Sequence, residues 1–105
     1  MKSDGFDWDV GNLAKCRKHG VSIAEIEWAL THDPVVAPDI AHSISEQRWI
    51  AIGRNQAQRA MYVAFTLRTR QGQIFTRPVS ARYMHAKEQK RYAQSAYKSS
   101  SDDDR

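Results

Sequence analysis

The chain has 105 residues, enough for one domain with a single core, and its hydrophobic content of 41% excludes a largely disordered protein. No apolar run approaches the roughly 18 residues that a membrane-spanning helix needs, and a single cysteine, Cys16, excludes an internal disulfide, so we expect a cytoplasmic protein. The net charge of +4 is uneven, because residues 47–97 hold ten Lys/Arg and one acid, a balance of +9 that predicts a phosphate-bearing or acidic partner.

The chain begins with signals for a short strand and a helix. Residues 6–9 alternate aromatic and acidic side chains, a pattern typical of a half-buried strand. Asp9 is a helix-capping residue and predicts a helix over about 10–18. Gly20 then supplies the left-handed position at which helices commonly end.

A second helix is predicted directly after the first. Ser22 and Glu25 have the spacing of a capping box, and an apolar face follows them. The helix is expected to end before Asp33-Pro34, because proline disfavours helical geometry at the residue preceding it. Residues 38–46 are polar and turn-prone, which predicts a loop.

Three strands are predicted in the middle of the chain. They cover residues 48–54, 60–68 and 73–81, and short polar or glycine-containing connections favour antiparallel hairpins. Pro78 interrupts the third strand and indicates either an edge position or a β-bulge.

The C-terminal region is expected to form a last helix over residues 85–97. The order of elements predicts an α+β fold in which a small antiparallel sheet of about four strands packs with three helices. We expect one domain over residues 1–97 and a disordered polar tail over 98–105.

One cysteine, Cys16, and one histidine, His19, lie near the end of the first predicted helix and are candidates for catalysis or metal binding. His19 suits general acid or base catalysis near neutrality, but a basic side chain at a helix C-terminus is equally explained by the helix dipole. Cys16 and His19 have a spacing that a metal could share, but no dense cluster of ligands accompanies them, so we predict no metal site. A small buried residue is the default interpretation of Cys16.

Acidic residues near the predicted cations leave two interpretations open. Glu46 and Arg48 share one face if the strand has begun, and form either a surface ion pair or an acid beside a phosphate binder. Glu88 either offers a carboxylate to a cleft or occupies the first turn of the last helix as an acid that suits the helix dipole.

Arginines are concentrated in the second half of the chain. Arg77 and Arg82 lie in one short stretch with Tyr83, and neighbouring strands carry Arg54, Arg59, Arg68 and Arg70. The guanidinium fork matches phosphate geometry, and aromatic rings can stack on unpaired bases. Strict alternation places Arg77 and Arg82 on opposite faces of the sheet unless a bulge at Pro78 intervenes. A solvated basic face is the alternative to an RNA site.

The motifs taken together resemble the BrnT family of bacterial toxins, from about Phe6 to Tyr92. The motifs are Trp8-Asp9, Asn12, Lys15, His19-Gly20-Val21, His42-Ser43, Glu46, Arg48, Ile52-Gly53-Arg54, Phe65-Thr66, Arg68, Arg77-Pro78, Ser80-Ala81-Arg82, Met84, Glu88 and Tyr92.

This resemblance implies a RelE-like ribonuclease fold and RNA cleavage that needs no metal or other cofactor. It also implies a hetero-oligomer with a cognate antitoxin encoded by an adjacent gene, and contact with operator DNA only through that antitoxin. Motif positions and the basic stretch together predict catalytic roles for His19, Glu46, Arg77, Arg82 and Glu88, and RNA binding by Lys18, Arg48, Arg54, Arg59, Arg68 and Tyr83.

Two functions follow as hypotheses. The first is an endoribonuclease toxin, which the acids and His19 among the arginines favour. The second is a non-catalytic module that binds nucleic acid or antitoxin, for which cations and aromatic side chains suffice.

Overall fold

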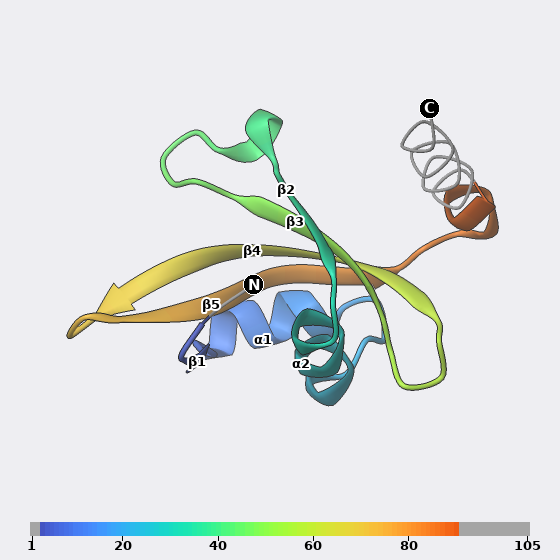
Figure 1. Ribbon diagram of the computed structural model, residues 1–105, viewed down its shortest axis with the longest axis horizontal. Coiled ribbons are helices and arrows are strands. Elements are labelled where there is room, and N and C mark those ends of the chain that lie inside the picture. The colour runs from blue at the N-terminus through green and yellow to red at the C-terminus, as the bar shows by residue number, and fades with distance from the viewer. Residues whose placement is uncertain (1–2, 91–105) are drawn as a thin grey trace, which may run out of the picture.

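A computed structural model describes residues 3–90 and shows a sheet with two α-helices packed on one face (Figure 1). The elements are β1 (Gly5–Phe6), α1 (Val10–Arg17), α2 (Ile23–Thr31), β2 (Val35–Pro38), the 3-10 helix η1 (Ile40–His42), β3 (Trp49–Arg54), β4 (Ala60–Arg70) and β5 (Gln73–Tyr83). Residues 86–90 are helical, while the rest of the helix predicted over 85–97 and the tail lie outside the described residues. None of the described helices is long and apolar enough to cross a membrane. The α+β class is confirmed.

The sheet has five strands in the order β1-β5-β4-β3-β2, with β1 and β5 parallel and the other pairs antiparallel. The expected four-stranded antiparallel sheet is therefore wrong at both edges. At one edge, β2 adds a strand of four residues that is too short for alternation to reveal it. At the other, β1 has two residues instead of the expected 6–9, because the chain turns into the cap of α1 at Asp9.

Both predicted helix starts are confirmed. Asp9 and Ser22 each accept a hydrogen bond from the backbone three residues on, and the side chains of Asn12 and Glu25 bond back to the capping backbone. Gly20 lies at φ +81° after the end of α1, as expected of a helix terminator. These caps determine the residues at which α1 and α2 begin.

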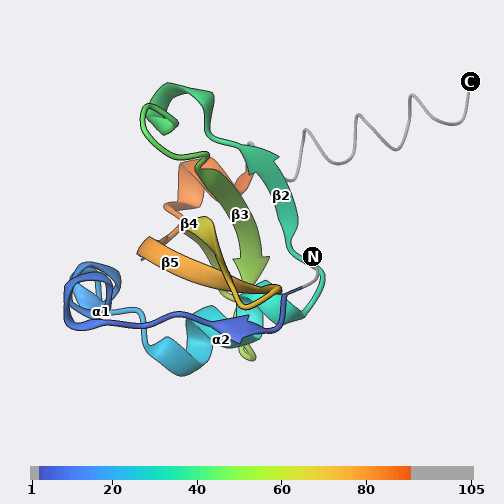
Figure 2. The same cartoon turned by 90° about the vertical axis from the view of Figure 1, so that its left-hand side faces the viewer.

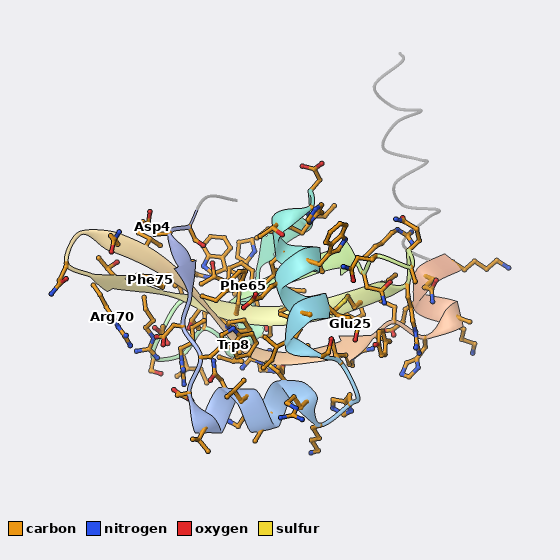
Figure 3. The ribbon with its side chains drawn as sticks, turned by 90° about the horizontal axis from the view of Figure 1, so that it is seen from below. Asp4, Trp8, Glu25, Phe65, Arg70 and Phe75 are labelled. Atoms are coloured by element: carbon orange, nitrogen blue, oxygen red, sulfur yellow. The ribbon has the colours of Figure 1, made fainter. Side chains whose placement is uncertain are left out.

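The core lies between the helices and one sheet face. Phe65, Met61 and Val63 from β4 pack with Ile26 and other apolar residues of α2, and all are at most 2% exposed. Phe65 lies at the centre of this layer in Figure 3. A Cβ on Gly53 would lie 3.0 Å from the Ala29 backbone oxygen, so β3 needs glycine at the point where α2 comes closest.

A bulge in β5 changes which face its arginines occupy. Ala64 pairs with Ser80 and Phe65 pairs with Pro78, which leaves Val79 as an extra residue. The interruption predicted at Pro78 is thus confirmed as a bulge. Since Tyr62 and Thr66 of β4, the partners of Arg82 and Arg77, are four residues apart, the register places both arginines on the same side of the sheet.

Candidate functional site

The sheet face opposite α1 and α2 carries a cavity of about 380 Å³. Figure 2 shows η1 above this face and α1 below it, so that the two segments border the sheet from opposite sides. The floor comes from alternate residues of the three central strands, among them Ile50, Ala64 and Ser80. Polar and charged side chains complete the lining: His19, Asp39, His42, Arg48, Tyr62 and Arg82.

Arg82 is the most firmly held cation of this cavity. Its guanidinium donates two hydrogen bonds to the Glu88 carboxylate, at 2.8 and 2.9 Å, and lies 4.5 Å from the centre of the Tyr62 ring. Arg82 and the backbone N–H of His85 together lower the pKa of Glu88 to about 2. Glu88 is therefore ionised at neutral pH, and it both starts the last helix and orients Arg82.

The η1 turn brings a histidine and an acid together. His42 Nδ1 lies 2.9 Å from Asp39 Oδ2, and the same carboxylate oxygen lies 3.8 Å from Arg48 Nε. Ser43 holds the turn, because its hydroxyl donates to the Asp39 carbonyl and accepts from the Arg48 backbone N–H. A region expected to be only a loop thus presents an ordered acid–histidine pair beside Arg48.

The end of α1 places His19 at the cavity, while Lys18 points elsewhere. Lys18 caps α1 and lines a separate hollow on the outer surface of that helix. Cys16 is fully buried, and this burial raises the pKa of its thiol to about 11, as expected of a packed residue. Within residues 3–90, no three His, Cys, Asp or Glu side chains are grouped so that they could hold a metal ion.

A family model described as "Ribonuclease toxin, BrnT, of type II toxin-antitoxin system" matches residues 8–88. The chain belongs to the BrnT family. Membership makes it a ribonuclease toxin of a type II toxin–antitoxin system by family and implies an antitoxin partner. None of the curated proteins compared with the chain matches it. The matched range includes every element that lines the cavity.

Other residues predicted for a BrnT site are engaged outside this cavity. Arg77 donates to the Asp9 carboxylate at 2.6 Å and so reinforces the cap of α1. Glu46 contacts Arg68 at 3.4 Å, and both side chains are well exposed. The open alternative of a Glu46–Arg48 pair is not observed among the described residues, since Arg48 contacts Asp39 instead.

A second group of predicted RNA-binding residues lies at the β3–β4 turn. Arg54 donates to the Gln58 carbonyl at 2.9 Å. The Arg59 guanidinium lies 3.6 Å above the Tyr83 ring, and the Tyr83 hydroxyl donates to Glu25 at 2.6 Å. Because Tyr83 pairs with Met61 of the core face, this group lies on the helix side of the sheet, away from Arg82.

Glu25, shown on α2 in Figure 3, is the centre of that second group. Partial burial alone would raise the pKa of Glu25, but hydrogen bonds from Tyr83, Asn55 and Ser22 outweigh it and lower the pKa to about 2. The bond to Glu25 also raises the pKa of Tyr83. The cluster joins the start of α2 to the end of β5, a structural role beyond the capping box seen in the sequence.

The cavity thus unites three predicted residues, His19, Arg48 and Arg82, with Glu88 directly behind Arg82. Sequence reasoning missed Asp39 and His42 as a pair. Their spacing of three residues was the available signal, because side chains at i and i+3 of a 3-10 turn lie above one another.

Proposed function

We propose that this BrnT-family protein cleaves RNA in the cavity on the open sheet face, on a RelE-like fold and without a metal ion. The supporting observation is the convergence of His19, Arg48 and Arg82 from three separate elements on one cavity of about 380 Å³. A surface that only neutralised phosphates would need cations but no histidine lining the same cavity.

The chemistry is attack of the RNA's own 2′-hydroxyl on the adjacent phosphorus. A 2′-oxygen–phosphorus bond forms, the bond to the 5′-oxygen breaks, and the products carry a 2′,3′-cyclic phosphate and a 5′-hydroxyl. Arg82 is suited to the additional negative charge of the pentavalent phosphate, because Glu88 fixes its orientation while Tyr62 supports it. His19 donates the proton to the leaving oxygen.

Arg48 provides the second cation of the site. Its only ion-pair partner among the described residues is Asp39, at the long distance of 3.8 Å, and its Nε makes no hydrogen bond there. Because that Nε is buried, the donors left for a phosphate oxygen are the terminal N–H groups of this side chain, which is 31% exposed. Arg77 lies on the same side of the sheet but pairs with Asp9, so Arg48 and Arg82 are the cations of the cavity itself.

An antitoxin is expected to neutralise the protein by occupying the same cations. An acidic segment and an RNA phosphate cannot both pair with Arg48 and Arg82, so binding of one excludes the other. The complex then contacts operator DNA through the antitoxin.

The test is incubation of the purified protein with a mixed-sequence RNA transcript in EDTA, with and without the small protein encoded by the adjacent gene. We expect cleavage with 2′,3′-cyclic phosphate ends, no cleavage where the 2′-hydroxyl is replaced by hydrogen, and suppression by the antitoxin. RNA that is bound but stays intact would identify a binding module instead, and cleavage abolished by EDTA would refute the metal-free chemistry.

A further inference from the structure

We infer that His42 is the general base of this ribonuclease site and that Asp39 positions it, an assignment that rests on the proposed RNA cleavage. The geometry is an imidazole whose Nδ1 lies 2.9 Å from Asp39 Oδ2, at the rim of the cavity that Arg48 and Arg82 also line.

The contact with Asp39 determines which nitrogen can accept a proton. A carboxylate only accepts hydrogen bonds, so a neutral His42 must carry its hydrogen on Nδ1 and leave the lone pair on Nε2. Within residues 3–90, Nε2 of His42 has no hydrogen-bond partner. A base needs this free lone pair, and an adjacent carboxylate stabilises the positive ring that forms when it takes a proton.

Asp39 is itself fixed from several directions, which makes it suited to orienting the ring. Its side chain is 13% exposed, whereas that of His42 is 66% exposed. Its backbone N–H donates to the Arg48 carbonyl, and its own carbonyl accepts from the Ser43 hydroxyl. The acid is therefore held by the fold, while the imidazole remains accessible to a substrate.

Charged and titratable side chains from several elements line the cavity together with His42. Asp39 and Arg48 lie beside it, His19 reaches the cavity from α1, and Tyr62 and Arg82 reach it from β4 and β5. Glu88 is paired with Arg82 and so partly balances it. The cavity thus holds two histidines that come from separate segments, His42 from η1 and His19 from the turn after α1, so that one can act as the base and the other as the acid.

The resulting step balances without any further reactant. Nε2 of His42 takes the proton of the 2′-hydroxyl while the 2′-oxygen–phosphorus bond forms. The bond from phosphorus to the 5′-oxygen breaks, and His19 supplies that oxygen with a proton. The two histidines exchange their protonation states with solvent before the next cycle.

The experiment uses the full-length protein and an RNA oligonucleotide that spans a cleavage site mapped on the mixed-sequence transcript. Single-turnover rates are measured at saturating RNA for His42→Ala, Asp39→Asn and His19→Ala, with the natural linkage and with a 5′-bridging sulfur. A sulfur leaving group needs no protonation, so it restores the rate of a variant that lacks the acid but not of one that lacks the base. His32→Ala is the control, because His32 is an exposed histidine stacked on Trp28 outside the cavity.

We expect His42→Ala to lose about 10²–10⁴ in rate on both linkages, because general base catalysis contributes that much. His19→Ala should recover on the sulfur linkage, and His32→Ala should cleave like the wild type. Asp39→Asn should bind RNA normally but cleave at least about tenfold more slowly, because an amide can donate to Nδ1 and reverse the tautomer.

The outcomes separate this assignment from the proposed function. Wild-type protein that cleaves no RNA would refute both. Cleavage lost in Arg82→Ala but unchanged in His42→Ala would overturn the assignment of His42 alone. Recovery of His42→Ala on the sulfur linkage would make His42 the acid and likewise overturn it.

Discussion

The hydroxyl of Tyr83 is a strong test of whether the Glu25 cluster stabilises the fold. Tyr83→Phe removes a hydrogen bond of 2.6 Å to a carboxylate but keeps the ring on which Arg59 packs. Hydrogen bonds to charged groups contribute about 1.5–3 kcal/mol. Since Glu25 is only partly buried, we expect the lower part of that range, about 1.5–2 kcal/mol.

The assay is urea and thermal unfolding at pH 7, with Tyr62→Phe as the control, because the Tyr62 hydroxyl makes no hydrogen bond within residues 3–90. A loss of this size should lower the Tm of a domain of this length by about 6–16 °C, whereas Tyr62→Phe should change stability by less than about 0.5 kcal/mol. Equal, small effects of the two substitutions would refute the structural role of the Tyr83 hydroxyl.

Three further predictions follow from packing and titration. The pKa of Glu25 is lowered from 4.5 to about 2, so its contribution to stability is complete above pH 4.5 and is lost as the pH falls toward 2. The difference in unfolding free energy between wild type and Glu25→Gln should therefore narrow as the pH falls from 4.5 to about 2. A difference that stays constant over this range would contradict the prediction. Asn12→Ala should cost about 1–3 kcal/mol, measured by urea unfolding, because the buried amide donates to the carbonyls of Asp7 and Pro78. Gly53→Ala should lower the free energy of unfolding by about 1–3 kcal/mol, because the added methyl group crowds Ala29. The control, Gly11→Ala on the exposed side of α1, should raise it by up to about 1 kcal/mol. Equal effects of the two substitutions would contradict the close approach of α2 to Gly53.

The sequence was sufficient to predict elements that begin or change at a residue whose own side chain determines the local backbone conformation. Asp9 and Ser22 cap their helices because short polar side chains satisfy free backbone N–H groups nearby, a contact made within three residues of sequence. The bulge at Pro78 likewise followed from the missing N–H of proline.

Contacts between residues far apart in the chain could not be predicted from the sequence. Strand β1 pairs with residues about 70 positions away, and no local pattern reveals a parallel pair of two residues. The partners of the candidate site residues have the same origin. Arg77 is 68 residues from its partner Asp9, and Tyr83 is 58 residues from its partner Glu25. The density of arginines in the sequence therefore could not distinguish arginines that form structural ion pairs from those that line the cavity.

The most direct test of a catalytic site on the open face of the sheet is the single-turnover cleavage rate of Arg82→Ala at saturating RNA, compared with that of Arg70→Ala. Arg82 lines the cavity, whereas Arg70 pairs with Asp7 near the end of the β4–β5 hairpin, beside Asp4 and Phe75 in Figure 3. With folding verified by thermal unfolding, we expect Arg82→Ala to lose about 10²–10³ in rate, and Arg70→Ala to cleave bound RNA at nearly the wild-type rate. Arg82→Ala protein that is folded, binds RNA and cleaves it as fast as Arg70→Ala would contradict a catalytic site on the open face of the sheet.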